Sequence, residues 1–256
     1  AMTDWAWRIP FLSSFVLVAI GLYVRLKLTE APIFIAALNK PKPKTLPMME
    51  VIVTHFKPLF LGMLICIAGY VLFYIMIAFS QIYAKSAPTV SEAGYAMGLG
   101  FSPQIFTALL MCSAISLAIT IAISGKYIDI VGRRIWLIWT TFGVAIFGLA
   151  LPYFLDNGTT TSLFWFLMIG MALIGMGYGP LASFLPELFP THARYSGASL
   201  TYNISGLFGA SVAAIIALPL NANYGLKGVG IYLTLNAVLS LIGLWFITET
   251  KDKHLA

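Results

Sequence analysis

A short charged segment of this chain has the residue types needed for ion pairs that hold helices together. Residues 125–134, GKYIDIVGRR, place one acid among three cations and between two glycines. Carboxylates and guanidinium groups at this spacing form charge-assisted hydrogen bonds, and the glycines permit a sharp turn and close helix approach. An alternative hypothesis is a basic turn that only orients the helices. The favoured interpretation is a tight turn that acts as a polar latch, made of Gly125, Asp129, Gly132, Arg133 and Arg134.

Two charged residues after a later apolar run could join this latch. Residues 185–198, LPELFPTHARYSGA, carry Glu187 and Arg194 beside two prolines that should stop the preceding helix. The alternative is an ordinary helix exit, where an exposed ion pair contributes only ~0–1 kcal/mol. Both interpretations remain open from the sequence.

The positions of the acids and histidines argue against enzyme chemistry. Every Asp, Glu and His falls in a loop or at the end of an apolar run, so catalysis or haem binding inside the membrane lacks candidate residues. Cys66 and Cys112 lie singly in apolar runs without CxxC spacing, as packing residues do. We expect no enzyme activity, no metal and no cofactor.

The elements that must position the charged segments are membrane-spanning helices. The chain is 60% hydrophobic and 9% charged, with a mean hydropathy of +0.91. A span needs roughly 20 apolar residues, and continuous runs of that length favour helices over barrel strands. The sequence predicts an all-α polytopic membrane protein with seven transmembrane helices, at residues 11–28, 59–83, 105–124, 135–155, 162–185, 197–220 and 230–248.

The distribution of cations predicts the orientation. The net charge of +6 gathers beside the predicted spans and forms no aromatic-interleaved basic face, so a nucleic-acid partner is not expected. Only Arg8, Lys85 and Lys227 fall on one side of the membrane. The other Lys and Arg residues fall on the side that also holds the C-terminus, so the positive-inside rule predicts that this side is cytoplasmic. They are Arg25, Lys27, Lys40, Lys42, Lys44, Lys57, Lys126, Arg133, Arg134, Arg194, Lys251 and Lys253.

The long polar connection after the first span divides the chain. It carries four prolines and several lysines, which prevent one continuous helix. Six spans follow it, the number in one half of a large transporter architecture. We expect residues 1–28 to be the last span of an otherwise missing N-terminal half, residues 29–57 a cytoplasmic linker, and residues 58–256 a C-terminal six-helix half.

Three motifs carry a resemblance to a known family. The spacing Gly-x3-Asp-x2-Gly-Arg-Arg in residues 125–134 resembles the turn between paired helices of the major facilitator superfamily. Residues 5–12, WAWRIPFL, and residues 185–198 resemble its metabolite:proton symporter branch. The resemblance implies a secondary transporter of small organic acids or zwitterions in the inner (plasma) membrane, working by alternating access. It also implies that the charged turns hold two halves together on the cytoplasmic face.

Polar residues within the spans are the candidates for a substrate cavity. A stripe on the third span recurs mostly every three or four residues, near one helix face, although small hydroxylated residues in membrane helices often serve packing. The resemblance implies that the second, third, fifth and sixth spans line the cavity, while the fourth and seventh lie outside. The predicted cavity residues are Tyr70, Tyr74, Gln104, Ser113, Ser116, Tyr202 and Asn203.

The expected function is proton-coupled symport of a small molecule. The partners are then the substrate, protons, the lipid bilayer and the missing N-terminal half. No span holds a mid-membrane ionisable group of the kind that marks proton relays, so the proton-binding residue is expected in the other half. The alternative is a seven-span receptor or sensor without transport activity, which the spacing in residues 125–134 disfavours.

Overall fold

The computed structural model describes residue 5, residues 8–27 and residues 47–249. The chain forms two units, Ala1–Lys44 and Thr45–Ala256. In the first unit, α1 (Arg8–Lys27) is a helix of 20 residues whose apolar side chains, such as Phe15 and Leu17, are exposed. This helix covers the first predicted span up to Lys27, and Leu28 lies outside the described residues.

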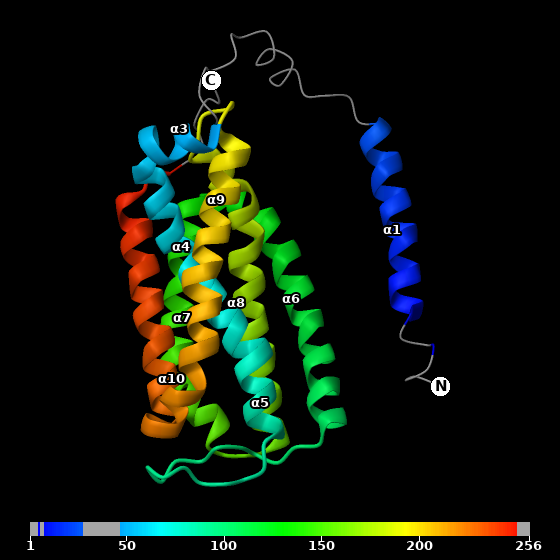
Figure 1. The fold of residues 1–256 in the computed structure, drawn as a ribbon, viewed down its shortest axis with the longest axis vertical. Coiled ribbons are helices and arrows are strands. Elements are labelled where there is room, and N and C mark those ends of the chain that lie inside the picture. The colour runs from blue at the N-terminus through cyan, green and yellow to red at the C-terminus, as the bar shows by residue number, and fades with distance from the viewer. Residues whose placement is uncertain (1–4, 6–7, 28–46, 250–256) are drawn as a thin grey trace. The chain divides into compact units, whose positions relative to one another are not determined.

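The second unit is a bundle of helices (Figure 1). Four further predicted spans are each confirmed as helical, and each helix extends a few residues beyond the prediction on at least one side. They correspond to α4 (Phe56–Tyr74) with η2 (Ile75–Phe79) and α5 (Ser80–Lys85), then α6 (Pro103–Val131), α7 (Arg133–Leu155) and α8 (Thr160–Glu187).

The sixth and seventh predicted spans lie in one helical stretch of 53 residues, Arg194–Phe246. It comprises α9 (Arg194–Gly206), the π-helical η3 (Leu207–Ser211) and α10 (Val212–Phe246). Gly225 interrupts it with a φ of 67° and a ψ of −170°. Because positive φ is accessible mainly to glycine, Gly225 is the point where the chain reverses between the two spans.

The composition of these helices fits a membrane. Five helical stretches within the described residues are long and apolar enough to cross one, and in these residues the extended structure is a single bridge between Val90 and Ala96. Large apolar side chains such as Ile115, Leu149 and Trp245 are exposed on the outside of the bundle. In lipid such exposure carries no hydrophobic cost. The chain is thus an all-α polytopic membrane protein.

The predicted tight turn at residues 125–134 is wrong in its extent. Helix α6 continues through Val131, and α7 begins at Arg133, so Gly132 alone breaks the helical path, with a φ of 103°. Gly125 lies inside α6, and a Cβ there would meet nothing within 4 Å. Lys126 and Asp129 therefore lie on the last turns of α6, and Arg133 and Arg134 lie on the first turn of α7.

Small residues allow α6 and α8 to pack closely. A Cβ on Gly175 of α8 would lie 2.6 Å from the Leu117 carbonyl oxygen of α6, and one on Gly179 would collide with Ser124. The Ser116 hydroxyl donates to the Met168 carbonyl of α8 at 3.1 Å. The glycines of α8 and much of the hydroxyl stripe of α6 thus meet across one helix contact.

A short helix within the predicted linker packs on the bundle. Helix α3 (Pro47–Thr54) buries Val51 in a small core with Leu59 and Phe189. The ring of His192, in the α8–α9 connection, contacts the Glu50 carboxylate with 2.7 Å between Nε2 and Oε1. Residues 47–54 therefore belong to the second unit.

Candidate functional site: a charged network and a tyrosine-lined pocket

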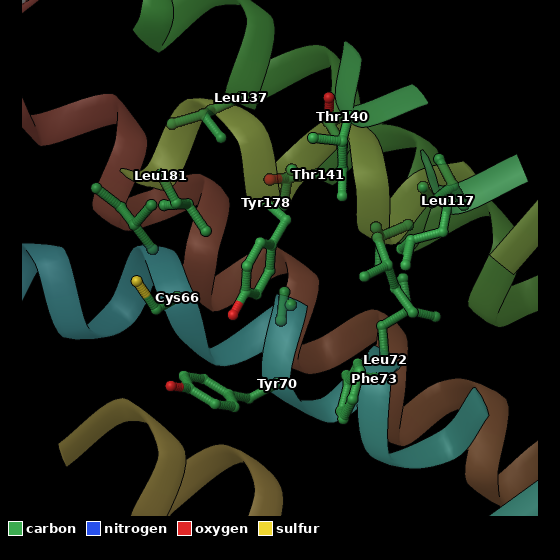
Figure 2. Close-up of a pocket in the computed structure, with 18 of the residues that line it drawn as sticks. Cys66, Tyr70, Leu72, Phe73, Leu117, Leu137, Thr140, Thr141, Tyr178 and Leu181 are labelled. Atoms are coloured by element: carbon green, nitrogen blue, oxygen red, sulfur yellow. The ribbon is translucent and has the colours of Figure 1, made fainter. Parts of the chain in front are cut away.

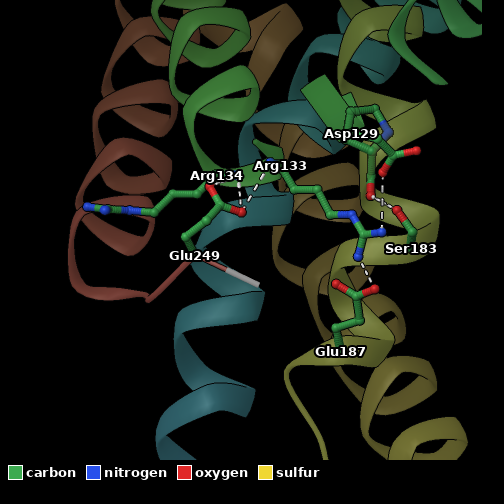
Figure 3. A network of polar contacts seen from close by, with 7 residues as sticks. Asp129, Arg133, Arg134, Ser183, Glu187 and Glu249 are labelled. Atoms are coloured by element: carbon green, nitrogen blue, oxygen red, sulfur yellow. Dashed lines mark hydrogen bonds and ion pairs between the residues drawn. The ribbon is translucent and has the colours of Figure 1, made fainter. Parts of the chain in front are cut away.

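A charged network joins the ends of α6, α7 and α8 (Figure 3). The Arg133 guanidinium at the start of α7 forms an ion pair with the Glu187 carboxylate at the end of α8. It also lies 3.5 Å from Asp129 Oδ1, one turn before the α6–α7 junction. The side chains of Arg133 and Glu187 are only 17% and 15% exposed, whereas that of Asp129 is 70% exposed. The Arg133–Glu187 pair is thus the buried centre of the network.

Glu249, which was not among the predicted network residues, completes the network from the segment that follows α10. Its carboxylate accepts hydrogen bonds from the backbone N–H groups of Arg133, at 3.1 Å, and Arg134, at 3.1 and 3.4 Å. These N–H groups form the first turn of α7, where a negative charge is stabilised by unpaired donors and the helix dipole. The only sequence signal was an acid directly after the last apolar run.

Arg134 points away from Arg133 and holds the end of α10. Its Nε donates to the Leu244 carbonyl at 2.8 Å and its terminal nitrogen to the Trp245 carbonyl at 3.0 Å. Cations at a helix C-terminus satisfy its last carbonyls. Arg134 therefore joins α7 to α10, while Arg133 joins α7 to α8.

The remaining predicted network residues have different environments. Gly132 provides the break between α6 and α7, and Gly125 is an ordinary helical position. Arg194 begins α9, and its buried Nε has no hydrogen-bond partner among the described residues. The same holds for Arg133 Nε and Glu187 Oε2. Such orphaned polar atoms are costly unless another group pairs with them.

A pocket lies within the second unit, between α4, α6, α7, α8 and α9. Its volume is about 230 Å³, and its lining is mainly aliphatic. The polar groups in it come from Cys66, two threonines and three tyrosines, and none of the described lining residues carries a charge. Figure 2 shows the ring of Tyr178 reaching from α8 across the pocket toward α4.

Two of the seven predicted cavity residues, Tyr70 and Tyr202, line this pocket. Tyr178 was missed because it stands among glycines and offers no periodic pattern of polar residues. The fourth span was expected outside the cavity, yet α7 contributes Thr140 and Thr141 to the lining. The reason is that α7 packs against α8 on the side where α8 borders the pocket.

The other predicted cavity residues do not line this pocket. Tyr74 packs against the main core, and Gln104 is exposed near the start of α6. Ser113 is buried and donates to the Leu110 carbonyl of its own helix. Asn203 is exposed and donates to the Ser199 carbonyl of its own helix. A role for these residues in substrate contact stays a prediction, as does the part of Ser116 beyond its contact with α8.

Comparison with known proteins places this helical membrane protein in a family. Residues 96–256 match the family described as "Sugar (and other) transporter". The chain belongs to this family, within the major facilitator superfamily. No solved structure matches it.

Several curated relatives align with nearly the whole chain. It is 89% identical, over all of its length, to a Haemophilus influenzae protein named "Putative metabolite transport protein", of which it covers 57%. It is 39% identical to the inner membrane metabolite transport protein YhjE of Escherichia coli, with 98% of the chain and 56% of that protein aligned. It is 28% identical to the glycine betaine/proline/ectoine/pipecolic acid transporter OusA of Dickeya dadantii, with 100% and 50% aligned. The chain thus spans about half the length of these relatives.

Proposed function

We propose that residues 58–256 of this chain form the C-terminal half of a secondary active transporter that carries a small organic acid or zwitterion together with protons across the inner membrane. The second unit supplies six of the spans, and the remaining spans form the partner half. The two halves rock about a central site, and the charged network closes on the cytoplasmic face, where the C-terminus also lies. The network and the pocket are the two parts of the second unit that this function uses.

The buried Arg133–Glu187 pair is the observation that carries the proposal. A buried ion pair contributes little net stability compared with apolar packing, so its presence at the end of the bundle calls for a role other than stability. Two buried atoms of the pair, Arg133 Nε and Glu187 Oε2, have no hydrogen-bond partner among the described residues, and the same holds for Nε of Arg194 at the start of α9. Groups of the partner half can pair with them in one conformation and leave them in the other, which is the behaviour of a latch.

The names of the relatives and the uncharged pocket support the proposed substrate class. Relatives at 27–29% identity are named as transporters of betaine, proline or ectoine, which are zwitterions. A dicarboxylate would need a counter-charge that the described pocket lining lacks. The described spans also carry no Asp, Glu or His in their middle, so we propose that the proton-binding residue belongs to the partner half.

Uptake measurements test this function. The native protein that carries this chain is reconstituted in liposomes with an imposed pH gradient, and uptake of radiolabelled proline, glycine betaine, a dicarboxylate and a sugar is measured. We expect gradient-dependent uptake of at least one zwitterion or organic acid, abolished by a protonophore. Ligand-induced signalling without uptake of any compound would instead favour the receptor alternative.

Variants of the ion pair test the latch. Arg133→Ala leaves the Glu187 carboxylate buried and unpaired, at a cost on the order of 3 kcal/mol, and we expect at least a tenfold loss of uptake with membrane insertion retained. Glu187→Ala should behave alike, and the exchange Arg133→Glu with Glu187→Arg should recover part of the uptake. The matched control is Glu92→Gln, on the exposed 86–102 connection. Normal uptake by both single variants would refute the latch.

A further inference from the structure

Three tyrosines from three different helices meet at the pocket. Tyr70 of α4 and Tyr202 of α9 have ring centroids 5.2 Å apart with planes at 64°, and Tyr178 of α8 lies 6.4 Å from Tyr202 with planes at 85°. Each of the three lines the pocket. Because the Tyr202 ring is steeply inclined to each of the other two rings, the ring faces that line the pocket do not all point in one direction.

The backbone of α9 and η3 fixes Tyr70 in this arrangement. A Cβ on Gly209 would lie 2.7 Å from Tyr70 Cβ, and one on Gly206 would lie 3.3 Å from the Tyr70 ring. Tyr70 thus packs against a surface of α9 and η3 on which larger residues in place of the glycines would crowd it. Tyr178, by contrast, is 53% exposed and is accessible to a ligand.

The three tyrosine rings suit a cation that has no N–H groups to donate, such as a quaternary ammonium group. The face of an aromatic ring attracts an ammonium group electrostatically, most strongly where water is excluded, and aromatic cages bind quaternary ammonium ligands in this way. The remainder of the lining is aliphatic apart from the ring of Phe73, a thiol and two threonine hydroxyls. A carboxylate finds no cation in this lining, whereas an alkylated ammonium finds both ring faces and apolar contacts.

We propose that Tyr70, Tyr178 and Tyr202 bind the ammonium end of a zwitterionic substrate, with the carboxylate directed toward the partner half. The assignment rests on the transport function proposed above and specifies its substrate as an ammonium zwitterion. The rings of the three tyrosines carry the recognition, and their hydroxyl groups are secondary. Figure 2 shows how Tyr178 and Tyr70 border the same space.

A pair of probes of equal shape tests the charge requirement on the unmodified protein. Glycine betaine and tert-butylacetate differ only in a quaternary nitrogen replaced by carbon. Binding of each to the detergent-purified native protein is measured by isothermal titration calorimetry, without any need for transport. We expect glycine betaine to bind at least tenfold more tightly. Equal affinities, or no binding of glycine betaine, would overturn the assignment.

Substitutions at the three positions then locate the site. Replacing Tyr70, Tyr178 or Tyr202 by Leu should each weaken glycine betaine binding about 5- to 30-fold, the range expected for a partly desolvated cation–π contact. The Phe variants keep the ring and should stay within about threefold of the native affinity. Tyr153→Leu is the control, because Tyr153 is 75% exposed on α7 and does not line the pocket. Leu variants indistinguishable from this control would place the ammonium elsewhere and contradict the assignment.

Failure of this site and failure of transport give different results. Uptake of a dicarboxylate, without binding of glycine betaine, would leave the proposed transport of an organic acid standing and refute the ammonium site. Tight, ring-dependent binding of glycine betaine without uptake of any compound would support the site and refute transport.

Discussion

Gly125 and Gly132, the two glycines of residues 125–134, differ in whether the structure requires a glycine at that position. Gly132 has a φ of 103°, and a Cβ there would lie 2.9 Å from Glu249 Oε2. Gly125 is helical, and its Cβ position is open. The residue that matters for the α6–α7 junction is therefore Gly132, because a side chain would strain the backbone and displace the Glu249 carboxylate from the first turn of α7.

Alanine substitutions at these two glycines should shift stability in opposite directions. Gly132→Ala should destabilise the protein by about 1–3 kcal/mol, the cost of a strained left-handed residue. Gly125→Ala should stabilise it by about 0.5–1 kcal/mol, because alanine is the better helix former. Thermal unfolding of the two purified variants in detergent measures both effects. Equal shifts in one direction would contradict this assignment of roles.

At the residue scale, the sequence indicates contacts most directly where the partners are close together in the chain. Asp129 and Arg133 are four residues apart in the sequence, so their contact at 3.5 Å spans only the single-residue break at Gly132. Glu249 contacts backbone atoms 115 and 116 residues away, and no local pattern encodes that distance. Tyr178 was missed for a related reason, since the pocket is defined by which helices pack together.

At the scale of elements, a proline in α8 explains a contact with α7. Pro180 lies inside α8 and has no N–H to donate to the carbonyl of Met176, four residues earlier. That carbonyl instead accepts a hydrogen bond from the Trp136 indole Nε1 of α7, at 2.9 Å. This hydrogen bond links α8 to α7 at the place where Pro180 removes a backbone hydrogen bond from α8.

A double-mutant cycle tests this compensation. Trp136→Phe leaves the Met176 carbonyl without its donor and should destabilise the protein by about 1–3 kcal/mol. In a Pro180→Ala background the new backbone N–H can pair with that carbonyl, so the same substitution should cost about 1 kcal/mol less. Thermal unfolding of the four proteins gives the coupling. Strictly additive effects would show that Trp136 contributes only packing.

The elements themselves were predictable because lipid imposes a simple requirement. An apolar run long enough to cross the bilayer must be helical, and the second to seventh predicted spans are helices in the structure. The ends of the helices were less predictable, since charged residues can continue a helix beyond the hydrocarbon region, as residues 125–131 do in α6. Which helices lie next to one another was not predictable, because it depends on packing between residues distant in the chain.

At the scale of the whole molecule, the described charges of the second unit separate to two ends of the bundle. Lys57, Arg133 and Arg194 lie at starts of helices, on the side of the charged network, while Lys85 lies at the end of α5, next to the 86–102 connection. The long apolar helices between them fix this separation. The positive-inside rule then predicts the network end as cytoplasmic.

Cysteine labelling tests this orientation. In a variant lacking Cys66 and Cys112, single cysteines are introduced as Glu92→Cys and Lys126→Cys, both at exposed positions at opposite ends of the bundle. A membrane-impermeant maleimide applied to intact spheroplasts should label the Glu92→Cys variant and leave the Lys126→Cys variant unlabelled until the membrane is permeabilised. The reverse pattern would invert the proposed topology.

Helix α8 carries Tyr178 in the pocket and Glu187 in the charged network, about 14 Å apart along one helix axis. A displacement of α8 that changes the pocket also changes the distance between Glu187 and Arg133. Thermodynamic reciprocity then requires that a ligand which weakens the ion pair is itself bound more tightly when the pair is broken, by the same factor. For such a displacement, ligand affinity and the strength of the Arg133–Glu187 pair would be two measures of a single conformational equilibrium.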